Sequence, residues 1–510
     1  MKYWIIFFLL LSMGITGCED VLDVTPENSL TFRNGIETEK DLGAALDATA
    51  LYMRTAGSTN FYEQTTKGSY ADKGSEENLY RLLSPEWIVT GYWNYYYIVI
   101  SQANIVLHFA DQVKMDDKRR KLYTGQAYFY KALAYFELVR RYGDCVLVKD
   151  EVDINPQAKS SWTEVADYAI EMAQNAVDDL VEFDKMTDYN GNSPRYKSTP
   201  SKGAANALLA HLCAWKAGGK YFAADKNYNE QELWKRAKEA CDSVILSGRY
   251  ELVGTPEEVC TEVLRGGSKE SIYETVYKDF FNELLAPGGI FCLAHFYQSY
   301  PVYPNSVPSD IQEMPFLVYS SKMLEMFPGD DLRRQAYFYK FDIYANPDSV
   351  SVTGGFAYPY KWREVYVNTN GEDSGEFINY YANLIWWRLA DIYLLRAECK
   401  VRLGDDAGAI KDLNIVRDRA HALRYNSSEY EGDLRYAIFK EREKELLFEG
   451  YRYYDIIRNG YARTELEGGF CTATDQDFTD GAFFLALPYG TQEFKNNPLM
   501  RQNKYWFKFM

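Results

Sequence analysis

Residues 389–420 read LADIYLLRAECKVRLGDDAGAIKDLNIVRDRA. Apolar side chains recur every three or four positions on both sides of a central Gly404-Asp405 turn, and they are Ala390, Tyr393, Ala397 and Val401 before it and Ala409, Ile410, Leu413 and Val416 after it. This spacing puts each set on one face of an α-helix. The stretch therefore predicts two helices, 389–403 and 406–420, that pack against each other.

The same periodicity occurs in other long runs, which are 93–109, 122–142, 162–181, 202–217 and 230–246. Helix pairs with small residues at their close contacts are typical of tetratricopeptide units, although the period here is irregular. A stack of such pairs buries a continuous core and leaves other segments free to form a binding face. We therefore expect a mainly α fold, with a tetratricopeptide-like helix-pair (α-α superhelix) scaffold over about 38–253 and 376–460.

Two stretches lack this periodicity and are rich in aromatic residues. Residues 254–375 contain Pro287-Gly288-Gly289 and repeated Tyr-Pro pairs, with helical spacing only at 320–327, and residues 57–90 form a second such stretch. Long loops inside a compact domain are usually functional or disordered. Their aromatic content favours function, so we predict a loop-rich, irregular second lobe at about 254–375, followed by a C-terminal segment at 461–510.

The first residues have the pattern of a bacterial lipoprotein signal. Lys2 precedes an apolar run, and Gly14-Ile15-Thr16-Gly17 leads into Cys18. The run is too short and too interrupted for a transmembrane helix. We expect residues 1–17 to be cleaved and Cys18 to be acylated, leaving a single unit over 18–510; the alternative is an ordinary secretory peptide. Several acyl chains would provide the two signals that stable anchoring requires.

Composition limits the classes of ligand. The net charge of −17 argues against nucleic acid, because phosphate binding depends on Lys and Arg. Aromatics make up 16% of the chain, which suits flat, ring-shaped ligands, although most of the tyrosines are expected to pack in the core. Seven cysteines remain beside Cys18 without any CxxC pair, so neither a zinc nor a redox motif is predicted. Cys213, Cys241 and Cys399 fit small core positions.

Catalytic motifs are absent from the sequence. The four histidines lack HExxH spacing, and no GxSxG or phosphate-binding glycine loop occurs. His108 and His211 fall in helical runs, where we expect core or surface roles. Asp188-Tyr189-Asn190-Gly191-Asn192 imitates a calcium loop, but Ser193 and Thr199 replace the required Gly and Glu, so we predict a polar turn and no metal or other cofactor.

The charged run 440–452, KEREKELLFEGYR, allows two interpretations. Glu445, Glu449 and Arg452 could form a buried site. Alternatively, the run is a helix with ion pairs four residues apart along its surface, each of which contributes a few tenths of a kcal/mol. We favour the surface helix.

Taken together, several marks in order along the chain resemble the SusD/RagB family of outer-membrane nutrient-binding lipoproteins. They are Cys18 to Pro26, the Trp93-Tyr97-Ile100-Asn104 face, Arg388 to Glu398, Glu441 to Gly460, and Asn497-Pro498-Leu499 with Gln502-Asn503. The resemblance implies a scaffold of tetratricopeptide-like pairs, a TonB-dependent barrel of the SusC type as partner, and placement at the outer face of the outer membrane. Members capture glycans or, in some cases, peptides, through loops that vary between members.

The ligand residues are therefore predicted on physical grounds. A sugar stacks on an exposed aromatic ring while polar side chains bind its hydroxyls. Our candidates from the two loop-rich stretches are Tyr62, Tyr70, Asp72, Trp87, Tyr92, Tyr297, Tyr300 and Tyr303. Two alternatives remain open. One is a peptide-binding protein, which would use main-chain hydrogen bonds and pockets. The other is a glycoside hydrolase, which needs only two carboxylates at the right separation.

Overall fold

The computed structural model describes most of the helical scaffold and parts of the remaining chain. The described residues are 35–66, 71–73, 93–149, 155–188, 190–194, 196–277, 318–320, 326–338, 356–357, 360–367, 369, 371, 374, 377–466, 469–487 and 495–509. All structural statements below concern these residues.

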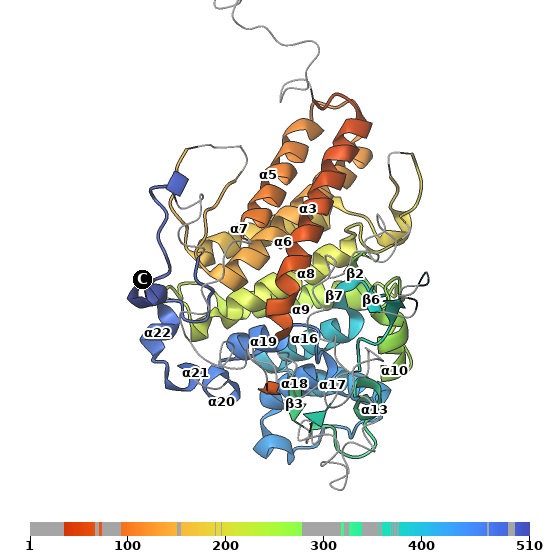
Figure 1. Ribbon diagram of the computed structural model, residues 1–510, viewed down its shortest axis with the longest axis vertical. Helices are drawn as coiled ribbons and strands as arrows, with labels where there is room; N and C mark the ends of the chain where they lie inside the picture. Colours follow the sequence, from red (N-terminus) through yellow and green to blue (C-terminus); the bar gives the residue numbers. More distant parts are fainter. Residues whose placement is uncertain are drawn as a thin grey trace, which may run out of the picture.

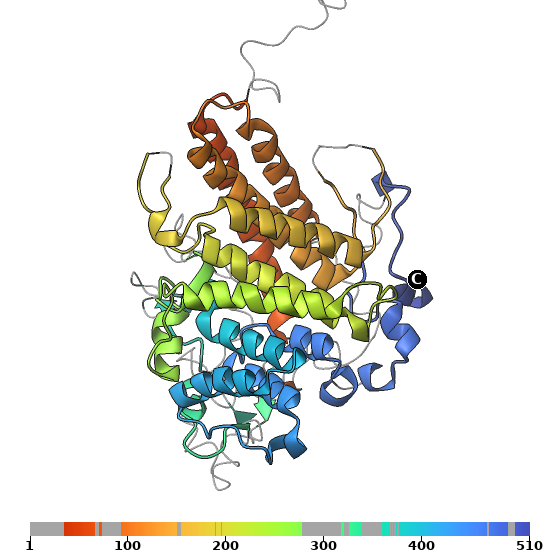
Figure 2. The ribbon, with the colours of Figure 1, turned by 180° about the vertical axis from the view of Figure 1, so that it is seen from behind.

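A stack of long helices forms the body of the molecule (Figure 1). Its first members in chain order are α3 (Glu39–Thr66), α5 (Trp93–Ala110), α6 (Asp117–Tyr142), α7 (Trp162–Asp179), α8 (Lys202–Gly218) and α9 (Glu230–Leu246). Each helix packs against the next, and Figure 2 shows the later ones lying one below another. The predicted helix-pair scaffold is confirmed.

The stack continues with residues far along the chain. α16 (Leu389–Arg402) packs against α9 on one side and α17 (Asp406–Arg419) on the other. α18 (Leu434–Glu445) then covers α16, and α19 (Arg452–Asn459) packs on the end of α8. The segment between α9 and α16 therefore leaves the helical stack and returns to it.

Side-chain caps explain why several helices begin where they do. The oxygen of an N-cap side chain accepts a hydrogen bond from a backbone N–H that has no partner inside the helix. Asp116 caps α6, Ser161 caps α7, Ser201 caps α8, Asn229 caps α9 and Asp405 caps α17. The observed starts of α7, α8, α9 and α17 agree with the predicted ones, whereas α6 begins five residues before the predicted position 122.

The predicted helix faces are the core faces. Ala127, Tyr130, Ala134 and Leu138 of α6 are all buried, as are the corresponding residues of α7 and α8. Cys213, Cys241 and Cys399 are buried free thiols, as expected. His211 is a core residue whose Nε2 lies 2.8 Å from Asp391 Oδ2 and whose ring stacks on Trp387, whereas His108 is exposed.

Short antiparallel strands connect the segments outside the stack. β2 (Ser271–Thr275) pairs with β7 (Leu384–Arg388), and both are fully buried. β3 (Val318–Ser320) lies between β1 (Ala71–Lys73) and β4 (Phe356–Ala357), while β5 (Val365–Val367) pairs with β6 (Phe377–Tyr380). The remaining elements are η2 (Phe183–Lys185), η3 (Gly219–Tyr221), α10 (Pro256–Glu258), η4 (Val259–Val263), α13 (Arg333–Tyr337), η8 (Glu429–Gly432), α20 (Ala462–Glu465), α21 (Gly469–Thr472), α22 (Asp475–Thr479) and η9 (Lys504–Phe509).

The boundaries of the two loop-rich stretches differ from expectation. α3 continues to Thr66, so the first ten residues of the 57–90 stretch are helical. Residues 256–277 contain α10, η4 and β2, which belong to the buried body. The expected helical spacing at 320–327 lies mainly outside the described residues. Aromatic and glycine content at 57–66 obscured the last turns of α3, a helix that packs against α5 and α6.

A buried set of charges joins these elements, and we call it the central charge cluster. All of its members are buried. They are the cations Arg333, Lys361, Arg388, Arg417 and Arg419 and the carboxylates of Glu270, Asp331, Glu441, Glu445 and Glu449. Arg388, at the end of β7, contacts Glu270 (2.8 Å), Glu445 (2.7 Å) and both oxygens of Glu449 (2.7 and 2.9 Å). Arg333 binds Glu441 at 2.6 Å, and Arg417 binds the other oxygen of Glu441 at 2.8 Å.

The preferred interpretation of 440–452 is therefore wrong. α18 is buried along most of its length, and Glu441 and Glu445 pair with cations from distant segments instead of with residues one turn away. Glu445 and Glu449 do share one buried site, through Arg388. Arg452 belongs to a separate group, since it binds Glu443 at 2.6 Å and Glu465 at 3.0 Å.

A tight turn after α18 completes the central charge cluster. Phe448 has a φ of 66°, a left-handed conformation that is unfavourable for a side chain of this size. The turn directs the Glu445 and Leu447 carbonyls at Lys361 Nζ, at 3.0 and 2.9 Å, and the Phe448 carbonyl accepts from the Trp362 indole. Lys361 thus caps α18, and these contacts hold the strained backbone.

The C-terminal segment docks on the scaffold through amide side chains. Gln502 exchanges two hydrogen bonds with the Leu487 backbone, both 2.9 Å long. Asn503 Nδ2 donates to the Tyr142 carbonyl at 2.8 Å, and its oxygen accepts from Lys159. Asn497 also donates to the Gln157 carbonyl. The two asparagines therefore fasten the chain end to the 142–159 region, and Gln502 ties it to residue 487.

The central charge cluster gives a stability prediction. Arg388→Leu should lower the free energy of unfolding by about 3–5 kcal/mol, because three buried carboxylates lose a shared cation. Chemical denaturation followed by tryptophan fluorescence measures this. Arg424→Leu is the matched control, since Arg424 pairs with Asp418 on the surface and its removal should leave stability unchanged. A loss below about 1 kcal/mol for Arg388→Leu would contradict the assigned role.

A second prediction concerns acid stability. Burial alone would raise the pKa of Glu398, but the Arg458 guanidinium, bound at 2.7 and 2.8 Å, outweighs it and lowers the pKa to about 2 from an ordinary 4.5. The folded state therefore binds this proton more weakly than the unfolded state. The stabilisation is present above pH 4.5 and is lost as the pH falls toward 2.

Glu398→Gln should remove that part of the pH dependence. Between pH 4.5 and 2 the variant's free energy of unfolding should fall less steeply than that of the parent. Urea denaturation at several pH values measures both slopes. Glu251→Gln, at a surface pair with Lys269, is the control and should keep the parent's slope. Equal slopes for the parent and Glu398→Gln would show that the Arg458 contact does not lower the pKa of Glu398.

Candidate ligand-binding site

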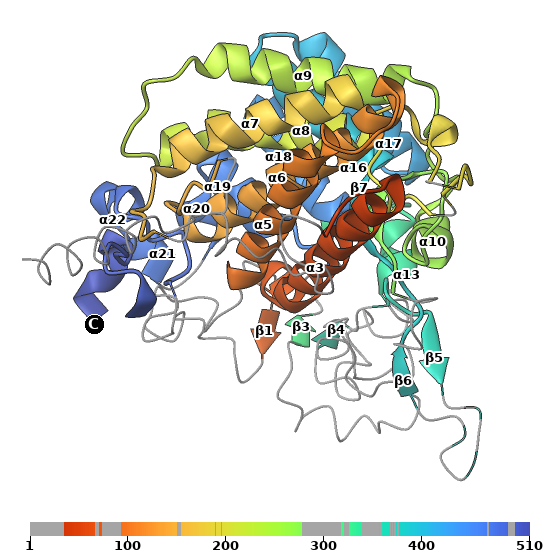
Figure 3. The ribbon, with the colours of Figure 1, turned by 90° about the horizontal axis from the view of Figure 1, so that it is seen from above.

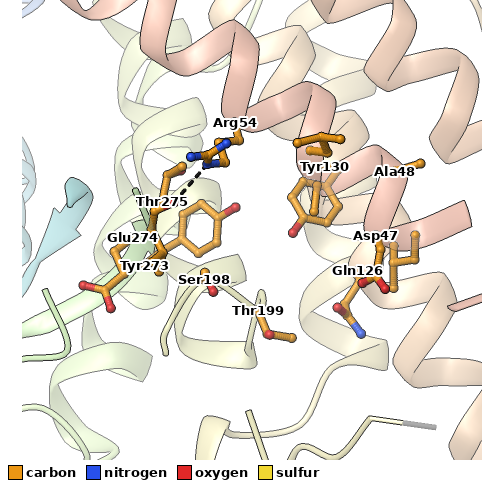
Figure 4. A pocket seen from close by; sticks show the side chains of 14 residues that line it. Asp47, Ala48, Arg54, Gln126, Tyr130, Ser198, Thr199, Tyr273, Glu274 and Thr275 are labelled. Atoms are coloured by element: carbon orange, nitrogen blue, oxygen red, sulfur yellow. Dashed lines mark hydrogen bonds between the residues drawn. The ribbon is translucent and has the colours of Figure 1, made fainter. Parts of the chain in front are cut away.

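A pocket of about 480 Å³ lies where α3, α6, β2 and residues 198–199 meet. Figure 4 shows side chains from all four segments around it. The lining residues are Leu46, Asp47, Ala48, Ala50, Leu51, Arg54, Gln126, Tyr130, Ser198, Thr199, Tyr273, Glu274, Thr275 and Val276. Its volume falls in the range of small-molecule sites.

The spacing of these residues along their helices and strand explains why they line one pocket. On α3, Leu46, Ala50 and Arg54 follow at intervals of four and so share a face, and Gln126 and Tyr130 do the same on α6. β2 supplies residues 273–275, and Val276 follows directly after the strand. The Glu274 N–H donates to the Lys197 carbonyl at 3.1 Å, which ties the 198–199 segment to the strand.

Two tyrosines form the inner wall. Tyr130 and Tyr273 are 2% and 3% exposed, and their hydroxyls point toward one another in Figure 4. The Tyr273 ring packs edge-on against Phe129 at 4.8 Å. Burial raises the pKa of both phenols above the ordinary value of 10, so they are neutral at physiological pH and can both donate and accept hydrogen bonds.

The charged groups of the wall are held by neighbours. Arg54 Nε donates to the Val276 carbonyl at 2.9 Å, and its guanidinium lies over the Tyr277 ring at 4.6 Å. Both carboxylate oxygens of Glu274 accept from the Gly267 N–H, at 2.9 and 3.0 Å. Lys197 Nζ donates to two carbonyls behind the strand, and burial lowers its pKa to about 8. These contacts make the pocket wall rigid.

The mouth is acidic. Asp47 is exposed to solvent, and its pKa is raised, first because the pocket wall displaces part of its water and second because Asp188 lies nearby. Asp188 holds the polar turn predicted from sequence, with its carboxylate accepting from the N–H groups of Asn190 and Asn192 at 2.8 Å. In the described part of the chain no group of three or more potential ligands could hold a metal ion.

This arrangement suits binding more than hydrolysis. A glycosidase needs two carboxylates facing its substrate. Of the two in the lining, Glu274 is fully buried and its oxygens are directed at Gly267, while Asp47 stands at the mouth. What remains around the pocket is a set of neutral hydroxyl and amide groups among apolar side chains.

The structure leaves the predicted aromatic site undecided. Tyr70, Trp87, Tyr92, Tyr297, Tyr300 and Tyr303 lie outside the described residues, as does Cys18. Tyr62 falls in α3 and Asp72 in β1, but nothing is described of their side chains. The backbone does connect the two stretches from which these residues come. β1 pairs with β3, with Ala71 opposite Tyr319, so the 57–90 and 254–375 stretches meet in one small sheet (Figure 3).

Sequence reasoning did not find the pocket. Tyr130 was assigned to the core face of its helix, which is correct, but its hydroxyl end also lines the pocket. Tyr273 and Arg54 gave no signal, because neither belongs to a motif. The one usable sign was Gln126, a polar residue one turn before Tyr130 on an otherwise apolar face.

Comparisons with known proteins agree with this fold. The SusD family model matches residues 316–506. A second family model, described as "Starch-binding associating with outer membrane", matches residues 20–213. Among the described residues, no helix combines the length and apolarity that crossing a membrane requires.

Individual relatives cover nearly the whole chain. SusD-like protein P2 of Formosa agariphila is 24% identical over 501 residues, or 90% of this chain and 91% of that protein. A solved SusD homologue from Bacteroides thetaiotaomicron has a TM-score of 0.73 at 24% identity, over 92% of this chain and 98% of its own. A laminarin-binding SusD-like protein has a TM-score of 0.68 at 21% identity, over 92% and 99%.

The two family matches together take in well over half of the 510 residues, and they include the Arg388 to Glu398 and Glu441 to Gly460 motifs whose charges meet in the central charge cluster. The chain therefore belongs to the SusD/RagB family of carbohydrate-binding proteins associated with the outer membrane.

Proposed function

We propose that this protein is a cell-surface lipoprotein that captures a glycan and passes it to a TonB-dependent outer-membrane barrel of the SusC type. The observation that carries the proposal is the pair of family matches, one of which is described as starch-binding and outer-membrane-associated. The pocket adds support, because its neutral polar groups match sugar hydroxyls.

The aromatic platform remains part of the proposal. Its members are Tyr62, Tyr70, Asp72, Trp87, Tyr92, Tyr297, Tyr300 and Tyr303. The pairing of β1 with β3 supports a common face for them, since it joins the two stretches of chain from which they come. Stacking on such rings would hold the apolar face of a sugar and leave its hydroxyls for polar neighbours.

A ligand screen tests glycan capture. The purified protein is titrated calorimetrically with plant, host and microbial polysaccharides, starting with laminarin because a solved relative binds it, and with peptides alongside. We expect affinity for at least one glycan and none for the peptides. Peptide binding in its place would indicate the alternative nutrient class, and steady release of reducing sugar would indicate a hydrolase.

The platform prediction uses two single variants. Trp87→Ala and Tyr297→Ala should each weaken binding of that glycan about tenfold or more, since each removes a stacking surface and about 1.4 kcal/mol corresponds to tenfold. Phe507→Ala is the control, because Phe507 is an exposed aromatic on the C-terminal η9. Circular dichroism checks that all three variants fold. Unchanged affinity in both platform variants would exclude the platform.

The anchor prediction compares two cysteines. Cys18→Ala should abolish incorporation of labelled palmitate and release the protein from the membrane, with a strong loss of glycan uptake by cells. Cys471→Ala should change neither, since Cys471 is an exposed cysteine in the C-terminal segment. Full uptake by the Cys18→Ala strain would show that acylation does not place the protein beside its transporter.

A further inference from the structure

We infer that the pocket between α3, α6 and β2 is a subsite for one uncharged sugar unit, separate from the aromatic platform. This inference rests on the proposed function, because it takes glycan capture as given and adds a place and a ligand class. The pocket lining shares no residue with the platform candidates.

The lining offers the two kinds of surface that a sugar ring presents. Leu46, Ala50, Leu51 and Val276 provide apolar surface for ring C–H groups. The polar groups are hydroxyls and an amide, from Tyr130, Tyr273, Ser198, Thr199 and Gln126. Hydroxyl and amide side chains can donate and accept, which is what vicinal sugar hydroxyls require. Specific small-molecule sites commonly combine apolar walls with a few placed polar groups.

Hydrogen bonds within the protein hold several side chains of the wall. Gln126 Nε2 donates to the Leu122 carbonyl at 2.8 Å, and Thr275 Oγ1 accepts from the Trp386 indole at 2.8 Å. Arg54 and Glu274 are held by Val276 and Gly267, as described above. Because these side chains already have fixed partners, binding of a small ligand costs little conformational entropy.

Charge selects against acidic sugars. Asp47 and Glu274 line the pocket, and Asp188 lies near its mouth. Among the described residues that line the pocket, Arg54 is the one cation, and its Nε–H donates to a backbone carbonyl while its guanidinium lies over the Tyr277 ring. A carboxylated sugar would bring a further negative charge past Asp47, which is unfavourable. A neutral hexose meets no such repulsion.

A filling variant tests the subsite. Ala50→Phe places a ring in the pocket from α3, while Ala44→Phe makes the same change on an exposed turn of the same helix that does not line the pocket. Binding of methyl glucoside, methyl galactoside, methyl mannoside and glucuronate is measured by saturation-transfer NMR and by titration. We expect at least one neutral glycoside to bind. Ala50→Phe should lower its affinity about tenfold or more, and Ala44→Phe should leave the affinity unchanged. Glucuronate should bind at least about tenfold more weakly than the neutral sugar.

Two smaller substitutions test the subsite independently, in case Ala50→Phe does not fold. Thr199→Val and Gln126→Leu remove hydrogen-bonding groups from the rim, where both residues are only half-buried. Each variant should bind the neutral glycoside about threefold to tenfold more weakly than the parent and should keep the parent's melting temperature.

The outcomes separate the subsite from the proposed function. If the parent binds a polysaccharide but no monosaccharide, or if Ala50→Phe, Thr199→Val and Gln126→Leu all keep the parent's affinity, the subsite is wrong and glycan capture stands. If glucuronate binds as well as the neutral sugars, the charge selection is wrong. If no glycan of any length binds, the proposed function fails first and the subsite with it.

Discussion

The burial of Arg388 is the constraint on which the rest of the structure depends. Its guanidinium is fully buried and needs carboxylates from three places, Glu270 before β2, Glu445 at the end of α18 and Glu449 in the following turn. A buried charge without partners costs several kcal/mol. The segments that carry these partners are therefore strongly favoured to assemble together. Arg388 is also the last residue of β7 and directly precedes α16, so its ion pairs hold the point where the strand passes into the helix, together with the turn that carries Glu449.

The ion pairs of Arg388 also position one wall of the pocket, because they hold β2 in place. Glu270 immediately precedes β2, and its pairing with Arg388 holds the strand against β7. Residues 273–275 of the strand and Val276 after it then form one wall of the pocket, which α3 and α6 complete. The pocket thus combines a wall fixed by buried ion pairs with a wall fixed by helix packing. Neither wall contains a residue of the proposed aromatic platform.

Sequence patterns predicted the features that depend on residues close together in the chain. The helices were predicted from apolar spacing, because that signal lies within a few residues along the chain. The charged run at 440–452 was misread, because its partners Arg388, Arg333 and Arg419 lie far away in the sequence and nothing in the run identifies them. The pocket was missed for a related reason. Tyr130 fits the core face of its helix and Tyr273 belongs to no motif, so only the meeting of α6 with β2 shows that they border a pocket.

α3 relates the pocket to the stretches that carry the platform candidates. Residues 46–54 of this helix line the pocket, and its last residue, Thr66, is followed closely by β1, which joins the two loop-rich stretches. Thr66 lies twelve positions after Arg54 on this helix, and at about 1.5 Å of rise per position the two residues are about 18 Å apart along its axis. A glycan held at both places must therefore be an oligosaccharide, since one sugar unit cannot cover that length. Affinity that rises with chain length would come from joining the two sites, whereas affinity for a single unit reports on one of them alone.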